Sequence, residues 1–385
     1  MAQIKARNSE ALFNQTETLK LFRRVLELNS KDFDANFEIA AIFERSDPGQ
    51  ALLYYEAGIK ILRDEIAKEK RSKFIGKWPS SATDPSSLLE LAQTMIPPEL
   101  LNNYAVLLTE TNKNHEAKKV LDEALANCEK MLAQDSEDIR LKALKITTKF
   151  NLACCIEALN NIGEATEIFK DVTKEEPSYT DAYIRLAYLA KRRGDLARAI
   201  GYVDTAITNS VQKPPHSKPV NLFCLRGKLL VEMGRLDEAK REFQKAMEMS
   251  GNRDTYAFIG LANINYTLSC MHRNDINGQE SQLRSALSKY FGILELDENN
   301  TYASLGIANL LTEYGKVDEA KEVFKLLANS EADNQLGLDA MLNQSHLWMA
   351  EENFDTAINL YQACLAKSPD NLEITMYLSK AHFRK

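Results

Sequence analysis

The feature that most constrains the fold of this chain is a pattern of residue types that recurs about every 34 residues. At each of positions 4, 7 and 11 most units have a large apolar residue, and small residues come at positions 8 and 20. Gly or Asn comes near position 15, and an aromatic or aliphatic residue comes at position 24. Such a period is typical of arrays in which each unit buries its apolar face only against its neighbours.

The pattern has a physical reason if each unit is a pair of antiparallel helices, A and B. The small residues then mark the closest crossing of the two helices, because larger side chains there would push the helices apart. Position 15 falls in the tight turn between them, which favours residues that tolerate a positive φ. Pro at position 32, present in two of the units, stops helix B.

About eight units follow this pattern. Six are regular and start at Pro98, Ile146, Thr180, Val220, Thr301 and Leu338. One near Phe33 has a short turn. The other is split, with its helix A near residues 255–268, its helix B near 281–296 and a polar segment, 269–280, that we expect to be a loop.

Both ends carry half a unit. Residues 16–28 have the pattern of a helix B without its helix A, and residues 372–383 that of a helix A without its helix B. Because arrays of this kind need polar caps at their ends, we expect the chain to be a piece of a longer protein.

Together these features resemble the tetratricopeptide repeat (TPR). The resemblance predicts an all-α fold, a right-handed α-solenoid (superhelix) of helical hairpins in a single array over residues 1–385. Another type of α-solenoid or a long helical bundle is the alternative. Arrays of this kind hold other proteins, so the prediction is a protein-binding chain.

An insert at residues 64–96 interrupts the array and is expected to be a loop. It contains a basic, partly aromatic run from Lys68 to Trp78, followed by a stretch rich in Pro and Ser. The run is either a solvated loop or a contact for a partner or nucleic acid. Trp78 favours a contact, because exposed Trp residues often anchor interfaces.

Composition and motifs argue against catalysis and against several classes of ligand. The net charge of −7 disfavours non-specific nucleic-acid binding, which needs a basic surface. No apolar run is long enough to span a membrane. The five histidines lack metal-ligand spacing, phosphate-binding and nucleophile motifs are absent, and the six cysteines resemble reduced core thiols. We therefore predict no enzyme activity, catalytic residue, cofactor, metal or small-molecule substrate, and no direct sequence-specific nucleic-acid or membrane binding.

Partners of such arrays bind in the groove lined by the A helices. Positions 2, 5, 9, 12 and 13 of the central units point into this groove. The predicted partner-binding residues are Phe150, Tyr188, Lys191, Arg192 and Lys228. Their mix of apolar and charged side chains suits an extended or helical segment of another protein. The Lys and Asn set with which chaperone adaptors hold a carboxylate does not occur in three successive units.

The order of the irregular units points to one family. The segments that carry this resemblance are Pro97–Asn103, Lys149–Ala153, Pro177–Leu186, Asn299–Ala303 and Met376–Phe383. From about residue 22 to residue 385 the chain resembles the large TPR scaffold subunit of the polymerase-associated factor (PAF) complex, which acts in transcription elongation. The 64–96 insert departs from that family.

The resemblance implies a central fragment of a non-catalytic scaffold in the nucleus. Its implied partners are the other subunits of the complex and RNA polymerase II, and its implied role is to support elongation and co-transcriptional histone modification. Two alternatives remain. One is a TPR scaffold of another assembly, such as a ubiquitin-ligase or ciliary complex. The other is the repeat arm of an enzyme, such as a protein glycosyltransferase, without its catalytic domain.

Overall fold

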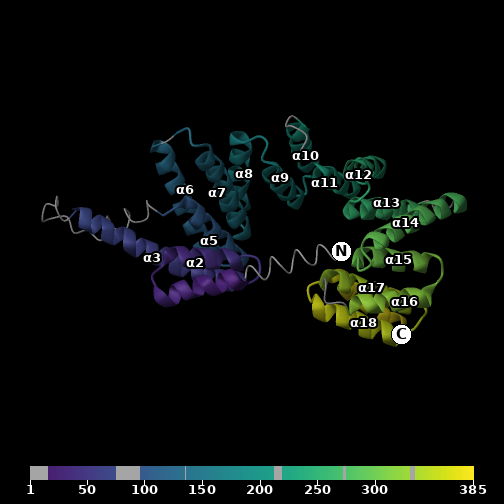
Figure 1. The fold of residues 1–385 in the computed structure, drawn as a ribbon. Coiled ribbons are helices and arrows are strands. Elements are labelled where there is room, and N and C mark those ends of the chain that lie inside the picture. Colours follow the sequence, from purple (N-terminus) through teal and green to yellow (C-terminus); the bar gives the residue numbers. More distant parts are fainter. Residues whose placement is uncertain (1–15, 75–95, 135, 212–218, 272–274, 330–333) are drawn as a thin grey trace. The chain divides into compact units, whose positions relative to one another are not determined.

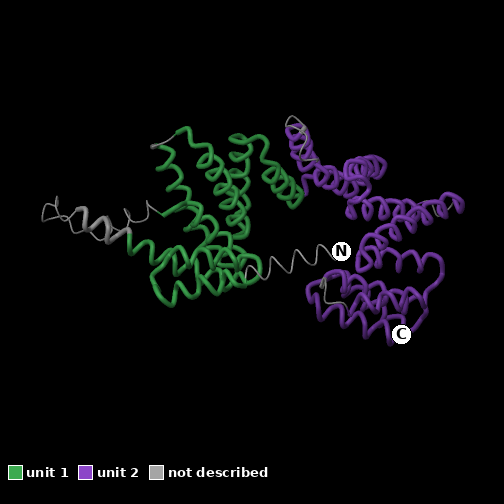
Figure 2. The backbone as a smooth tube through the Cα atoms, in the orientation of Figure 1, with its two compact units in different colours: residues 1–193 green, residues 194–385 purple. Residues whose placement is uncertain are grey.

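The computed structural model describes residues 16–74, 96–134, 136–211, 219–271, 275–329 and 334–385, and the side chains of most of them. All regular secondary structure in these ranges is helical (Figure 1). The described chain divides into two compact units, residues 1–193 and 194–385, and each is considered by itself (Figure 2). The single continuous array therefore stays a prediction.

In the described part of the first unit, a helix over residues 16–28 precedes seven further helices. These are α2 (Phe33–Phe43), α3 (Pro48–Phe74), α5 (Pro98–Glu110), α6 (Asn114–Gln134), α7 (Ile139–Ala158), α8 (Ile162–Glu175) and α9 (Thr180–Arg192).

The second unit continues the alternation of A and B helices. Its helices are α10 (Leu196–Val211), α11 (Val220–Glu232), α12 (Leu236–Ser250), α13 (Thr255–Met271), α14 (Ile276–Leu296), α15 (Thr301–Glu313), α16 (Val317–Ala328), α17 (Asn334–Ala350), α18 (Phe354–Lys367) and α19 (Leu372–Arg384). None of the helices in the described ranges is long and apolar enough to cross a membrane.

The core forms where the predicted small residues bring two helices together. Ala153 of α7 and Ala165 of α8 are fully buried, as are Ala308 of α15 and Ala320 of α16. Large side chains such as Phe324 fill the space beside these crossings. The α-solenoid of TPR hairpins predicted from the sequence is thus confirmed.

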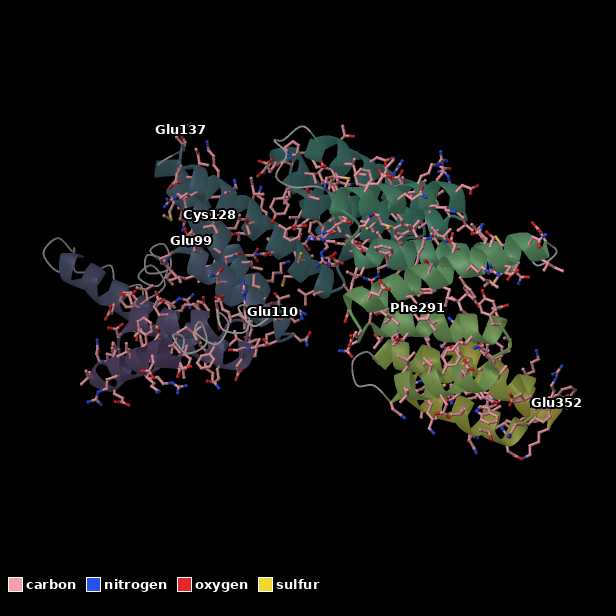
Figure 3. All side chains as sticks on the ribbon, turned by 45° about the vertical axis from the view of Figure 1, so that its right-hand side comes forward. Glu99, Glu110, Cys128, Glu137, Phe291 and Glu352 are labelled. Atoms are coloured by element: carbon pink, nitrogen blue, oxygen red, sulfur yellow. The ribbon has the colours of Figure 1, made fainter. Side chains whose placement is uncertain are left out.

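The turns between helices have the left-handed backbone that the pattern predicts at position 15. The residues with positive φ at these turns are Asn112, Asn160, Gly194, Gly234, Gly315 and Glu352. Glu352, at the turn between α17 and α18, is the unexpected one because an acidic side chain replaces Asn or Gly (Figure 3). An L-residue in this conformation costs about 1–2 kcal/mol relative to glycine.

Two predicted loops are shorter than expected. The prediction of a loop over 269–280 is wrong for most of its length, because α13 continues to Met271 and α14 begins at Ile276. The Asp275 side chain accepts a hydrogen bond from the backbone N–H of Gly278 and so caps α14. The Ser269 hydroxyl donates to the carbonyl of Tyr266 and is thereby satisfied inside α13.

The predicted insert loop over 64–96 is likewise wrong for its first part, because α3 continues to Phe74. This part contains no Gly or Pro and is rich in Glu, Lys, Arg and Ala, which are good helix formers. Residues 75–95, including Trp78, lie outside the described residues.

Candidate protein-binding surface

A cavity of about 280 Å³ lies on the A helices α11, α13 and α15 of the second unit. It is lined by Lys228, Val231, Phe243, Tyr256, Ile259, Gly260, Asn263, Ile264, Thr267 and Tyr302. Drug-sized ligands need cavities of roughly 300–1,000 Å³, so this one suits a side chain and its neighbouring backbone better than a small molecule. We call it the α13 groove.

Two glycines lie against the ring of Phe243, which lines the α13 groove. A Cβ atom at Gly260 would lie 2.6 Å from the Phe243 ring, and one at Gly227 would lie 2.9 Å from the same ring. Phe243 belongs to α12 and is almost fully buried. Because neither glycine has a side chain, this ring can pack against both α11 and α13, and the two A helices contact each other.

Asparagine side chains of α13 and α15 are held in a fixed orientation. The hydroxyl of Tyr290, on α14, donates to the Oδ1 atom of Asn263 at 2.5 Å. The Nδ2 atom of Asn343, on α17, donates to the Oδ1 atom of Asn309 at 3.1 Å. Since both Oδ1 atoms accept protein hydrogen bonds, the Nδ2 hydrogens of Asn263 and Asn309 remain as donors to a ligand.

Tyrosine rings flank these amides. Tyr256 of α13 is 47% exposed and Tyr302 of α15 is 52% exposed, although both line the groove. Of the described residues that line it, Lys228 alone carries a charge. The surface thus combines two half-exposed tyrosine rings, an oriented amide and one ammonium group.

The predicted partner-binding residues fall on both units. Lys228 lines the α13 groove. Tyr188 of α9, in the first unit, is 42% exposed. Arg192 is exposed and donates to the Oδ1 atom of Asn160 at 3.2 Å. Lys191 is half-buried.

Phe150 is half-buried, and its ring packs on two other aromatic rings. Its centroid lies 5.5 Å from that of Phe169 and 5.1 Å from that of Tyr179. Sequence reasoning did not select Tyr256, Asn263 or Tyr302. They stand at positions 2 and 9 of their units, so the same position rule applied to the split unit and its successor would have found them.

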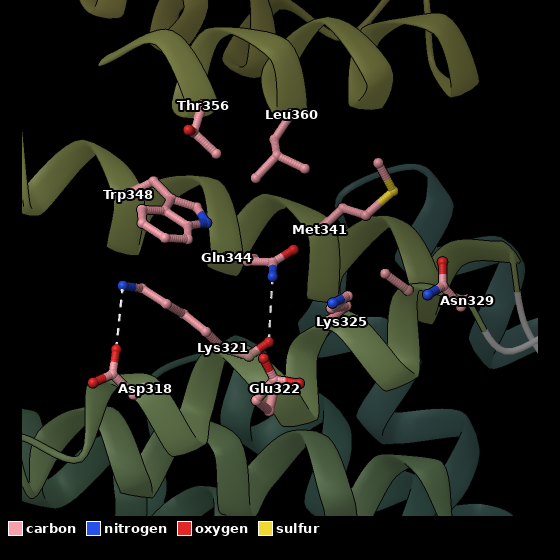
Figure 4. Close-up of a pocket in the computed structure, with 11 residues that line it drawn as sticks. Asp318, Lys321, Glu322, Lys325, Asn329, Met341, Gln344, Trp348, Thr356 and Leu360 are labelled. Atoms are coloured by element: carbon pink, nitrogen blue, oxygen red, sulfur yellow. Dashed lines mark hydrogen bonds and ion pairs between the residues drawn. The ribbon is translucent and has the colours of Figure 1, made fainter. Parts of the chain in front are cut away.

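A second cavity, of about 660 Å³, lies between α16, α17 and α18 (Figure 4). Lys321 is only 7% exposed, and its Nζ atom lies 3.8 Å from the centroid of the Trp348 ring. The same Nζ atom lies 2.5 Å from Glu351 and 3.7 Å from Asp318. Two carboxylates and an aromatic face therefore compensate one nearly buried ammonium group.

His346 of α17 sits beside this region, among rings of α18 and α19. Its Nδ1 atom lies 2.7 Å from the Tyr361 hydroxyl, and its ring meets Tyr377 edge-on at 4.4 Å between centroids. Burial lowers the pKa of His346 below its ordinary value of 6.5, and Glu373 partly opposes this effect.

Four of the six cysteines are buried, and Cys154 and Cys270 are half-buried. Cys128 is fully buried (Figure 3), and burial raises the pKa of its thiol to about 11. Burial likewise raises the pKa of Cys154 to about 11 and that of Cys224 to about 12. Thiols with such pKa values are protonated near neutral pH and are poor nucleophiles. Among the described residues, no group of three or more His, Cys, Asp or Glu gathers that could hold a metal ion.

Comparison with known proteins agrees with this architecture. Models of the tetratricopeptide repeat match residues 157–214 and 220–253. A TPR protein from Parabacteroides merdae has a similar fold, with a TM-score of 0.54 at 13% identity, covering 74% of this chain and 98% of that one.

Curated relatives from a plant, a worm and a yeast carry the name CTR9. The RNA polymerase-associated protein CTR9 of Caenorhabditis elegans is 24% identical over 94% of this chain and 29% of its own length. The CTR9 homolog of Arabidopsis thaliana is 31% identical over 62% of this chain and 22% of its own length. The chain thus spans less than a third of either relative. The chain is thus an α-solenoid with tetratricopeptide repeats that is similar, over most of its length, to a protein named RNA polymerase-associated protein CTR9.

Proposed function

We propose that this chain is a non-catalytic scaffold of an RNA polymerase II-associated elongation complex. In that role it binds other subunits of the complex in the nucleus and supports transcription elongation and co-transcriptional histone modification. The observation that carries the proposal is the homology to a protein named RNA polymerase-associated, which extends over 94% of this chain. An array of helical hairpins is also a common means of holding several proteins at once.

The surface chemistry supports binding and offers little for catalysis. Exposed tyrosines and fixed amide donors on the A helices suit a segment of another protein. The thiols of Cys128, Cys154 and Cys224 have raised pKa values and are protonated near neutral pH, which is unfavourable for nucleophilic chemistry.

The test is affinity purification of the tagged chain from nuclear extract, followed by quantitative mass spectrometry. We expect RNA polymerase II and subunits of its associated elongation complex to be enriched over a tag-only control. Enrichment of ubiquitin-ligase or ciliary components without polymerase would contradict the proposal and favour another TPR assembly. Recovery of a glycosyltransferase domain would favour the third alternative.

A further inference from the structure

Hydrogen-bond donors form a row at equivalent positions of three successive A helices; Lys228 and Asn263 line the α13 groove, and the third donor, Asn309, lies on the next A helix, α15. Lys228, Asn263 and Asn309 each directly follow a small residue at a helix crossing, namely Gly227, Ala262 and Ala308. The helices that carry them, α11, α13 and α15, contact one another in order. The row therefore crosses the A helices in one direction, within a single compact unit.

The donors of the row suit a ligand with little net charge, because two of the three are neutral amides. The carbonyl oxygens of Asn263 and Asn309 are occupied by Tyr290 and Asn343, so these amides present N–H groups. A phosphate backbone would call for several cations, whereas this groove has one, Lys228. Peptide carbonyls are uncharged acceptors of the kind that such amides hold.

The conformation of the ligand follows from the availability of its carbonyls. In an α-helix or a sheet most carbonyls already accept backbone hydrogen bonds. A polyproline II segment has no internal hydrogen bonds, so all of its carbonyls can accept hydrogen bonds from another molecule. Exposed aromatic rings beside a donor are the usual surface for such segments, since proline rings pack on their faces. Tyr256 and Tyr302 are half-exposed and line the same groove as Asn263.

Resting on the proposed function, we infer that the α13 groove binds an uncharged, proline-rich segment of a partner protein in the polyproline II conformation. The amides of Asn263 and Asn309 donate to backbone carbonyls of the segment. Its proline and aliphatic side chains pack on Tyr256 and Tyr302, and Lys228 holds a further carbonyl.

The experiment is fluorescence anisotropy of the whole 385-residue chain with labelled peptides. The probe is a peptide of alternating Pro-Pro-Leu units, compared with a peptide of equal length in which every Pro is Gly. Asn263→Asp removes the amide donors but keeps the Oδ1 acceptor for Tyr290. Asn277→Asp, at an exposed site in the first turn of α14, makes the same change of charge outside the groove.

We expect the proline peptide to bind at least tenfold more tightly than the glycine peptide. Asn263→Asp should weaken its binding about tenfold or more, because a carboxylate would face a carbonyl, while Asn277→Asp should leave it unchanged. Raising the salt from about 0.05 to 0.5 M should change affinity less than about twofold, since the ligand is uncharged.

Three outcomes would overturn the inference. They are no binding of the proline peptide, equal binding of the glycine peptide, and displacement of the proline peptide by an RNA oligonucleotide with steep salt dependence. If Asn263→Asp loses helical circular dichroism together with peptide binding, the residue is structural, and this result would also count against the inference. Capture of elongation subunits from nuclear extract can succeed even if the peptide fails, so the two proposals are tested separately.

Discussion

The nearly buried Lys321 allows a sharp test of how ion pairs act inside this array. Its ammonium group lies near Asp318 and the face of Trp348 (Figure 4). It also forms an ion pair with Glu351. Glu351→Gln should remove one charge partner and leave the ammonium nearly buried. The loss of a charge-assisted hydrogen bond costs about 1.5–3 kcal/mol. Because the Glu351 side chain is 40% exposed, solvent screens the pair, and we expect about 1–2 kcal/mol.

Lys321→Met should be milder, within about 1 kcal/mol of the wild type, since replacing a buried charge by an apolar side chain of similar length also removes its desolvation cost. The double variant Lys321→Met, Glu351→Gln should match Lys321→Met within about 0.5 kcal/mol, because the pair is already broken. Urea unfolding followed by circular dichroism at 222 nm measures the stability of all three variants. The comparison holds if the variants share the same dependence of the unfolding free energy on urea concentration. If Lys321→Met is the more destabilised single variant, the ammonium adds net stability and the reasoning is wrong.

Gly260→Ala should destabilise the second unit by about 1–3 kcal/mol, because the added methyl group would overlap an aromatic ring, as urea unfolding would show. Gly201→Ala, also mid-helix but with open space around it, should instead stabilise the chain by up to about 1 kcal/mol; destabilisation there would contradict the packing argument. Burial depresses the pKa of His346, so the unfolded chain takes up the proton first and stability should fall as the pH drops below about 6.5. His346→Gln should flatten the fall in the urea midpoint between pH 7.5 and 5.5, and an unchanged slope would exclude this histidine as its source. The pair Tyr188→Ala and Lys191→Glu should weaken capture of nuclear partners without changing the circular dichroism; lost helicity would mean that both residues are structural.

Much of the fold could be predicted because the repeat pattern reports helix crossings. Ala153 and Ala165 are fully buried where the pattern required small residues, and Asn160 has the positive φ expected at the turn. What the pattern cannot report is where helices end beyond the crossings. Helix α3 extends over residues 64–74, and α13 and α14 include most of residues 269–280. Local helix propensity and the Asp275 cap determine where these helices end and begin.

The binding surface was less predictable for a different reason. A position rule identifies which side chains lie on the A helices, but it does not say which of their polar atoms are already bonded. The orientation of Asn263 depends on Tyr290, which is 27 residues away in sequence. Phe150 satisfied the rule, yet its ring is engaged by Phe169 and Tyr179.

The left-handed Glu352 has a consequence for how this sequence could change over evolutionary time. Glu352 keeps this strained conformation because helices α17 and α18 fix both ends of the turn. Two backbone hydrogen bonds fix it further. They run from the Glu352 N–H to the Met349 carbonyl and from the Asn353 N–H to the Trp348 carbonyl. A change to Gly or Asn would relax it by about 1 kcal/mol. Such a site gives a lineage a ready compensating substitution, so that a destabilising change elsewhere in the second unit, including one that alters partner choice, can be tolerated and then kept.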